Sequence, residues 1–360
     1  MVGREVPVTV WSREKVKAAI VGSTGYGGVE LIRLLQAHPL VEITSVVSFS
    51  SSGQLLTEGF PHLTNVLNRV LDEVDVPLLA SKADVVFLAT PSGVSAKLVP
   101  SFVDAGMRVI DLSGDFRLIT QELYREWYNK EPAPADYLSR TVYGLTEVFG
   151  EEVKGASFIS NPGCYPTAAA LGLVPAVQEG WIEPSSLIID AKTEISGAGR
   201  GLGLQVHYAE ANENFSAYKV NRHQHIPEIE QTLSRVLGQG VTVTFTTHLV
   251  PMTRGIMATM YGTLLGDKSD QDFIDLYQSY YEGRPFIRIR PQGKWPATKE
   301  VSGSNYCDIG FSVDRRTGRV TIISVIDNVV KGAAGQAIQN LNVSMGWDET
   351  TGLLFAPIYP

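Results

Sequence analysis

A strand, a glycine-rich turn and a helix follow one another near the start of the chain, and this order constrains the fold more than any other feature. Residues 16–21 (VKAAIV) are an apolar run, and the turn Gly22-Ser-Thr-Gly-Tyr-Gly-Gly28 comes directly after it. The apolar residues of 29–38 then recur at helical spacing. Residues 41–47 (VEITSVV) predict the next strand, which completes a βαβ unit. The pattern therefore predicts a parallel sheet with helices on its faces.

The remaining strands and helices predict two different domains. Two more strands of the buried type, with a crossover helix between them, continue the parallel pattern at 83–89, 94–104 and 108–112. After about residue 185, strands are predicted at 187–191, 241–250, 256–265, 286–289, 306–313 and 319–326, and helices at 225–237, 270–282 and 329–345. We expect an α/β protein with an N-terminal doubly wound Rossmann domain plus an α+β domain whose sheet is mixed or antiparallel.

The composition argues against several classes of function. The chain has 360 residues, a formal net charge of −8 and scattered Lys and Arg, which argues against binding to nucleic acid or to an anionic membrane surface. Residues 1–15 lack the apolar core of a signal peptide, and no apolar run approaches the roughly 18 residues of a membrane span. With two cysteines and no disulfide framework, we expect a cytoplasmic protein. A small anionic substrate is compatible with this charge, since one or two arginines suffice for it.

The glycine turn predicts a dinucleotide site. Gly22, Gly25 and Gly28 follow a strand and open a helix, so backbone N–H groups can face a pyrophosphate there. Their spacing differs from G-x-G-x-x-G, and a tight turn without a ligand is the alternative. At the end of the second strand, Ser48-Phe-Ser-Ser-Ser-Gly53 stands where an NAD enzyme has a carboxylate. Hydroxyls can donate hydrogen bonds to a 2′-phosphate, whereas a carboxylate would repel it, so we predict NADP over NAD. An ordinary serine-rich loop is the alternative.

The segment Ser160-Asn-Pro-Gly-Cys-Tyr-Pro-Thr167 predicts a nucleophile. A Pro-Gly turn precedes Cys164, and a helical run begins near Pro166, a residue type favoured in the first turn. At a helix N-terminus the dipole and the free N–H groups stabilise a thiolate, so we expect a lowered pKa and a nucleophilic sulfur. Cys307 lies in a strand-like run and is expected to be a buried structural residue.

Two histidines are candidates for the proton partner of this cysteine. His223 and His225 directly precede a predicted helix, and we favour His223 as the acid/base group. Metal binding by the pair is the alternative. No other Cys or His lies at ligand spacing nearby, so no metal is predicted.

Two arginines are candidates for binding an anionic substrate. Arg200 stands in the glycine-rich run 196–203, where it is suited to a carboxylate or phosphate. Arg117 follows a predicted strand at the end where open α/β sheets bind ligands. A structural ion pair of Arg117 with Asp115 or another carboxylate is an equal alternative.

With these segments in hand, the chain resembles the N-acetyl-γ-glutamyl-phosphate reductase family of the semialdehyde dehydrogenase group, from Lys17 to the C-terminus. The resemblance rests on the glycine turn, on SNPGCYPTA and HQHIPEIEQ, and on further stretches at 111–117, 142–147, 190–192, 196–200, 303–306 and 327–335. Where many members have Pro-His-Gly, this chain has Pro91-Ser92-Gly93, so that loop lacks an imidazole.

The resemblance implies roles for particular residues. Cys164 takes the place of the family's catalytic cysteine, and the pair His223 and His225 falls on its acid/base motif. The implied cofactor is NADPH/NADP⁺, bound by Gly22, Ser23, Thr24, Gly25, Tyr26, Gly27, Ser48, Ser50, Ser51 and Asn328. The implied substrate-binding residues are Arg117, Arg200, Ser196, Gly197 and Asn161.

The resemblance also implies the domain organisation. Residues 16–163 with 329–360 would form the NADP-binding Rossmann domain, and 164–328 the catalytic, substrate and oligomerisation domain. Residues 1–15 are an extension without an assigned role. The expected assembly is a homo-oligomer, either a dimer or a tetramer.

The implied reaction is NADPH-dependent reduction of N-acetyl-γ-glutamyl phosphate, an anionic acyl phosphate, to N-acetylglutamate 5-semialdehyde through a cysteine thioester, a step of arginine biosynthesis. Related enzymes that act on aspartyl phosphate or on a carrier-linked aminoadipyl phosphate share the nucleotide turn and the thiol, and they are the closest alternatives. A non-catalytic NADPH-binding sensor and a cysteine hydrolase are alternatives from other classes, although a hydrolase has no need of a dinucleotide turn.

Overall fold

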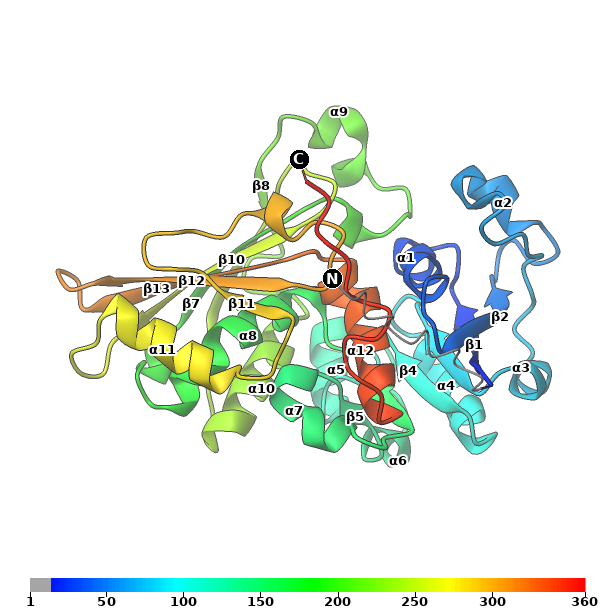
Figure 1. Cartoon of the computed structure of the whole chain (residues 1–360), viewed down its shortest axis with the longest axis horizontal. Coiled ribbons are helices and arrows are strands. Elements are labelled where there is room, and N and C mark those ends of the chain that lie inside the picture. The colour runs from blue at the N-terminus through cyan, green and yellow to red at the C-terminus, as the bar shows by residue number, and fades with distance from the viewer. Residues whose placement is uncertain (1–13, 360) are drawn as a thin grey trace, which may run out of the picture.

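A computed structural model describes residues 14–359 and shows two sheets (Figure 1). The first sheet has six parallel strands in the order β2-β1-β3-β4-β6-β5. Their bounds are β1 Val16–Val21, β2 Val41–Val47, β3 Val85–Leu88, β4 Arg108–Asp111, β5 Val142–Tyr143 and β6 Phe158–Ser160. Because the strand order reverses between β1 and β3, ligands of such a sheet bind at the carboxyl ends of these two strands.

Side chains of β1 alternate between two covered faces. Ala18 and Ile20 share a core with helix α1 on one face, and Ala19 and Val21 share another core with α3 and α4. The helices of this part are α1 Tyr26–Leu35, α2 Leu56–Gly59, α3 Val76–Lys82, α4 Ser95–Asp104, α5 Gln121–Tyr128, α6 Ala135–Leu138 and α7 Thr146–Val153, with a 3₁₀ turn at Pro61–Leu63. Burial on both faces explains why these strands are apolar runs instead of alternating ones.

The second sheet has seven strands in the order β11-β12-β13-β10-β7-β9-β8. Their bounds are β7 Ile188–Thr193, β8 Ser216–Tyr218, β9 Thr244–Leu249, β10 Ile256–Thr263, β11 Ile287–Ile289, β12 Cys307–Asp314 and β13 Arg319–Ile326. The pairs β7/β9 and β11/β12 are parallel, and the other pairs are antiparallel. The sheet is therefore mixed, which confirms the expected fold class of a doubly wound domain plus a second α+β domain.

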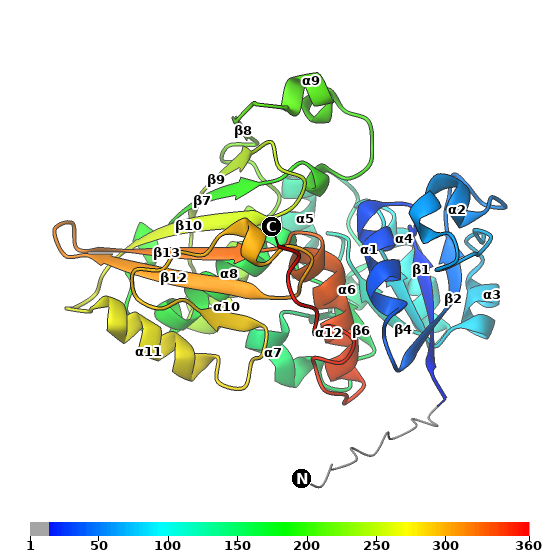
Figure 2. The ribbon, with the colours of Figure 1, turned by 45° about the horizontal axis from the view of Figure 1, so that its top comes forward.

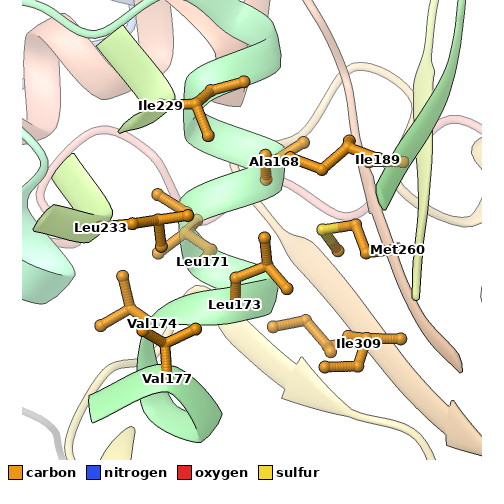
Figure 3. Packing of buried hydrophobic residues seen from close by; sticks show 14 of the residues in the cluster. Ala168, Leu171, Leu173, Val174, Val177, Ile189, Ile229, Leu233, Met260 and Ile309 are labelled. Carbon is orange, nitrogen blue, oxygen red and sulfur yellow. The ribbon is translucent and has the colours of Figure 1, made fainter. Parts of the chain in front are cut away.

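Helix α8 is the centre of the second core. It is buried from Tyr165 to Val177, so it is apolar on all sides. Figure 3 shows Leu171 facing Leu233 of α10 on one side and Leu173 near Met260 of β10 on the other. The helices of this part are α8 Cys164–Gln178, α9 Tyr208–Ala211, α10 Ile226–Leu237 and α11 Asp270–Tyr280, with 3₁₀ turns at Pro184–Ser186, Ser196–Ala198, Leu204–Val206 and Thr298–Glu300. The last helix, α12 Gly335–Ser344, belongs to the core of the first sheet. The packing around α8 fixes the position of its first turn.

The predicted helix over 329–345 is wrong in one respect, because it consists of two parts. A π-helix at Val330–Ala334 precedes α12. Asp327 explains the wider turn: its carboxylate accepts the amides of Val329 and Val330, and its carbonyl accepts the Gly332 amide five residues on. A Cβ on Gly332 would come 2.8 Å from the Cβ of Cys164. The π-helix thus brings the C-terminal segment against the predicted nucleophile.

Helix α12 packs on the first sheet, beside α1 (Figure 2). We propose that residues 16–163 with 329–360 form the nucleotide-binding domain and that 164–328 form the second domain. The interpretation of residues 1–15 concerns positions that lie almost entirely outside the described residues, 14–359. Within that described range, no helix has the length and apolar character needed to cross a membrane.

Candidate active site

Cys164 is the first residue of α8, as its sequence context predicts. Strand β6 ends at Ser160, and a Pro-Gly turn leads into the helix. The N-cap residue is Gly163 and no side chain caps the helix, so first-turn N–H groups are left for an anion. A Cβ on Gly163 would come 2.6 Å from Nε2 of His225. Only glycine therefore lets the histidine approach the turn of the nucleophile this closely.

Cys164 lines a cavity of about 400 Å³. The other walls come from the end of β7, the loop that follows it and the segment before α10, and they include Tyr165, Glu194, Gly197, Tyr218, His223 and His225. The ring of Tyr165 lies edge-on to both imidazoles, with centroid distances of 5.2 Å and 6.0 Å. The structure thus gathers the predicted cysteine and both predicted histidines around one cavity.

The surroundings of Cys164 keep its sulfur protonated in the chain by itself. Burial raises the pKa of Cys164 to about 12, and the Glu194 carboxylate adds to that rise, while Arg117 and the Tyr165 amide oppose it. The expectation of a lowered pKa is therefore wrong here, because desolvation and a carboxylate outweigh the helix N-terminus. Cys307 is fully buried, as predicted for a structural residue.

The two histidines have different hydrogen-bond partners. Nδ1 of His223 accepts the amide of His225 at 3.1 Å, so the neutral ring of His223 carries its proton on Nε2. Nε2 of His225 instead accepts from the guanidinium of Arg117 at 3.4 Å. Burial lowers the pKa of His223 to about 3 and holds that of His225 well below its usual range. Both rings are neutral near pH 7, and His223 has an N–H that is available as a proton donor.

Glu228 of α10 ties the turn of the nucleophile to the rest of the site. Its Oε1 accepts the Gly163 amide and the Tyr143 hydroxyl, each at 2.8 Å. Its Oε2 lies 3.6 Å from Nη1 of Arg117, and both side chains are buried. Burial raises the pKa of Glu228, whereas Arg117 acts to lower it. Removing either charge would leave the other uncompensated in the interior.

Two predicted substrate ligands lie in buried structural contacts. Arg117 donates from Nε to the Asn161 carbonyl at 2.8 Å, and its pair with Glu228 is the structural ion pair that the sequence left open. The side-chain amide of Asn161 donates to the Ala333 carbonyl at 3.1 Å, and its oxygen accepts from Asn340 at 2.9 Å. Neither Arg117 nor Asn161 lines the cavity. We infer that both position the turn of the nucleophile.

The loop after β7 supplies a buried carboxyl group that sequence reasoning missed. Glu194 accepts the Gly197 amide and the Thr193 hydroxyl, each at 2.7 Å. Both donors are neutral, and burial raises the pKa of Glu194 to about 7. Ser196 of the same loop accepts from the side-chain amide of Asn328 at 3.0 Å, which ties this loop to the segment before the π-helix.

The sequence assigns no role to either carboxylate: Glu228 lies within HQHIPEIEQ, and Glu194 stands two residues before the glycine-rich run. A carboxylate in the first turn after the two histidines was the available signal for Glu228. No comparable signal marks Glu194, since burial alone sets its chemistry. Among residues 14–359 no group of three or more His, Cys, Asp or Glu gathers to hold a metal.

The glycine turn has the shape of a phosphate cradle. Gly22 has a φ of +85°, and a Cβ there would come 2.8 Å from the carbonyl carbon of Ala89. A Cβ on Gly28 would come 2.7 Å from the Cα of Ser23. The N-cap residue of α1 is Gly25, and no side chain caps this helix either. The turn therefore leaves the N-terminus of α1 open to an anion.

The serine-rich loop after β2 borders the glycine turn. Oγ of Ser48 lies 3.3 Å from Oγ1 of Thr24. Thr24, Ser50 and Ser51 line a second cavity, of about 330 Å³. Ser23 is buried and donates to a β2 carbonyl at 3.0 Å, so we infer that it shapes the turn.

These features fit a bound NADPH. The open helix N-terminus with Tyr26 and Gly27 in its first turn suits the pyrophosphate, and the hydroxyl-lined cavity suits the adenosine ribose with its 2′-phosphate. Asn328, near the Cys164 cavity through Ser196, suits the nicotinamide end. We infer that the residues near β2 would hold the nucleotide and that those near α8 would face its reactive end.

Arg200 lies apart from the nucleophile. Its guanidinium stacks over the ring of Phe60 at 4.3 Å from the ring centroid. Arg200 lines the hydroxyl-lined cavity and not the cavity of Cys164. The prediction that it holds the substrate beside the nucleophile therefore finds no support in this geometry.

Comparisons with known proteins identify the class. The model of the semialdehyde dehydrogenase NAD-binding domain matches residues 17–156, and that of the semialdehyde dehydrogenase dimerisation domain matches residues 164–328. A solved aspartate semialdehyde dehydrogenase II from Vibrio cholerae aligns with a TM-score of 0.69 over 92% of this chain and 98% of that chain, at 19% identity. A solved aspartate semialdehyde dehydrogenase with NADP from Candida albicans gives a TM-score of 0.69 over the same shares, also at 19% identity. The two matching models, together with the glycine turn and the cysteine at the start of α8, place the chain in the semialdehyde dehydrogenase class.

Curated relatives narrow the class. An N-acetyl-γ-glutamyl-phosphate reductase from Geobacillus sp. (strain WCH70) is 56% identical over 342 residues, covering 95% of this chain and 99% of that protein. One from Geobacillus thermodenitrificans is 57% identical over 345 residues, covering 96% and 100%. The chain therefore belongs to the N-acetyl-γ-glutamyl-phosphate reductase family.

Proposed function

We propose that the chain reduces N-acetyl-γ-glutamyl phosphate to N-acetylglutamate 5-semialdehyde with NADPH, through a thioester on Cys164. The observation that carries this proposal is the cavity at the N-terminus of α8, where a cysteine and a proton-donating histidine meet in a chain 56% identical to reductases of that name. A role in arginine biosynthesis follows from this reaction.

The first step uses the geometry at the start of α8. The Cys164 sulfur attacks the γ-acyl carbon, the bond from that carbon to the phosphate oxygen breaks, and a thioester forms. First-turn N–H groups after Gly163 face the carbonyl oxygen that becomes negative in this step. The thiol proton leaves with the phosphate, which departs as hydrogen phosphate, so charge and protons balance.

We assign the acid/base role to His223. Its Nε2–H donates a hydrogen bond to the departing phosphate oxygen while the thiol proton passes to that phosphate, so the ring stays neutral throughout the step. His225, held between Gly163 and Arg117, keeps the turn and the first histidine in place. This assignment agrees with the preference for His223 drawn from the sequence.

NADPH, when bound at this site, would supply the hydride that reduces the thioester. The resulting thiohemiacetal oxygen is held by the same first-turn N–H groups until the carbon–sulfur bond breaks. That cleavage releases the aldehyde and returns the sulfur as a thiolate, which takes a proton before the next turnover. Glu194 favours this reprotonation, since its carboxylate raises the pKa of Cys164.

The assembly and the location of the protein are part of the proposal. We infer a homo-oligomer, a dimer or tetramer, formed through the second domain, since the matching model is a dimerisation domain. We infer a cytoplasmic location from the biosynthetic reaction and the free cysteines.

The test is phosphate-dependent reduction of NADP⁺ in the reverse direction. N-acetylglutamate semialdehyde and aspartate semialdehyde are compared at equal concentration, with Cys164→Ala as the blank. We expect activity on the first substrate, and at least about 10²-fold less on the second, because aspartate semialdehyde lacks the acetyl group and is one methylene shorter. Greater activity on aspartate semialdehyde would assign the chain to the related enzyme, and no activity on either would reject the proposal.

A further inference from the structure

We propose that Arg200 binds the 2′-phosphate of NADPH and gives the chain its preference for NADPH over NADH. The inference rests on the nucleotide site of the proposed function, but it concerns a residue of the second domain. It assigns Arg200 to the cofactor instead of the substrate.

The position of Arg200 is the first reason. The cavity of about 330 Å³ at the end of β2 is lined by Thr24, Ser50 and Ser51 from the first domain and by Arg200 from the loop after β7. In a doubly wound sheet, the residues after the second strand face the 2′ position of the adenosine ribose. Arg200 therefore reaches the place where NADPH and NADH differ.

Charge is the second reason. Residues 48–59 contain no Lys or Arg, so the serine-rich loop offers hydroxyls and N–H groups but no cation. A 2′-phosphate carries up to two negative charges, and a guanidinium matches it with two parallel hydrogen bonds. None of the ion pairs formed within residues 14–359 includes Arg200, whose guanidinium contacts the Phe60 ring, so its N–H donors are available.

Phe60 is the third reason, because it holds the guanidinium in place. The ring is buried, with 7% of its surface exposed, and the guanidinium carbon lies 4.3 Å above the ring centroid. Stacking uses the flat face of the guanidinium and leaves its N–H edges free for a phosphate. The contact also joins the two proposed domains, so a phosphate in this cavity would be bound by hydroxyls of the first domain and by the guanidinium of the second.

The experiment measures binding without substrate. Isothermal titration with 2′,5′-ADP and with 5′-AMP separates the 2′-phosphate from the rest of the adenosine half, and it is run on the wild type, Arg200→Met and Arg222→Met. Arg222 is an exposed arginine of the same domain that does not line this cavity, so it is the matched control. We expect Arg200→Met to weaken 2′,5′-ADP about tenfold or more and to leave 5′-AMP unchanged, with Arg222→Met like the wild type.

Kinetics supply the second readout. The ratio of kcat/KM for NADPH to that for NADH should fall by a similar factor in Arg200→Met, with Arg200→Lys in between because a lysine keeps the charge but stacks less well. Unchanged 5′-AMP binding shows that the variant still folds. An equal loss of affinity for both ligands in Arg200→Met would overturn the inference. So would equal affinity of Arg200→Met and the wild type for 2′,5′-ADP. Neither result would count against the proposed reductase reaction. A wild type that prefers NADH would overturn the inference together with the cofactor assignment.

Discussion

Helices α1 and α8 begin in the same way and do different things. Each follows a strand of the first sheet, each has a glycine as its N-cap residue, Gly25 and Gly163, and neither is capped by a side chain. The start of α1 adjoins a serine-lined cavity, and Tyr26 in its first turn is 43% exposed. The start of α8 is enclosed, with the buried carboxyl groups of Glu194 and Glu228 nearby. One helix end suits a phosphate, and the other holds a protonated thiol.

The comparison shows that a helix N-terminus does not by itself decide the charge of what it holds. Its partial positive charge favours an anion by about 0.3–1 kcal/mol at an exposed site. Burial of a thiolate costs more than this, and Glu194 adds like-charge repulsion at α8. Neighbouring groups therefore decide whether the same backbone arrangement attracts an anion or keeps a sulfur neutral.

The largest expected effect is on catalysis at the start of α8, with nucleotide binding at the start of α1 left unchanged. Cys164→Ala removes the nucleophile at α8, so phosphate-dependent reduction of NADP⁺ should fall by at least about 10³-fold. Binding of NADPH at α1, measured by titration calorimetry, should stay within about twofold. Cys307→Ala, at a buried cysteine away from the cavity, is the control and should keep its activity. Residual activity above about 10% in Cys164→Ala would show that the sulfur is not the nucleophile.

Glu228→Gln tests what holds the start of α8. The amide keeps an oxygen for the Gly163 N–H but leaves Arg117 buried without a carboxylate, so the free energy of unfolding should fall by about 3–5 kcal/mol. Urea unfolding followed by fluorescence measures this. The matched change Glu152→Gln breaks the surface pair with Arg235 and should cost under about 1 kcal/mol. Equal losses in the two variants would mean that the buried pair contributes no more than a surface one.

Gly28→Ala tests the cradle at α1. The added Cβ would come 2.7 Å from the Cα of Ser23, so the turn has to shift and KM for NADPH should rise roughly tenfold or more. Gly240→Ala is the control, since Gly240 lies outside the nucleotide site and a Cβ there would meet nothing within 4 Å. The reactivity of Cys164 toward iodoacetamide should change in neither variant. A similar KM in both variants would argue against the tight approach at Gly28.

The smallest effect concerns the charge beside the sulfur. Glu194→Gln removes a negative charge that disfavours the thiolate, so the pKa of Cys164 should fall and its alkylation by iodoacetamide should become roughly three- to tenfold faster at pH 8–9. Since the pKa of Glu194 is about 7, the wild-type carboxyl becomes neutral below that pH and the difference should disappear there. Mass spectrometry of the Cys164 peptide gives the rates. Glu210→Gln, at an exposed carboxylate, should match the wild type; slower alkylation in Glu194→Gln would contradict the electrostatic explanation.

The first domain was largely predictable, because its signals are local. The apolar run at 16–21 and the turn at 22–28 each depend on neighbouring residues, and the structure places β1 and the start of α1 there. Strand order and the mixed pairing of the second sheet depend on partners far apart in the sequence. The π-helix at Val330–Ala334 was missed for the same reason, since it results from hydrogen bonds to Asp327 and close contact of Gly332 with Cys164.

By itself, the sequence determined that Cys164 begins a helix after a Pro-Gly turn and that a glycine turn opens α1, because residue types over a few positions set such turns. Only the tertiary structure decided the charge of the sulfur and the place of the two arginines. Desolvation and Coulomb interactions depend on distances across the fold, and these bring Glu194 near Cys164, pair Arg117 with Glu228 and set Arg200 over Phe60.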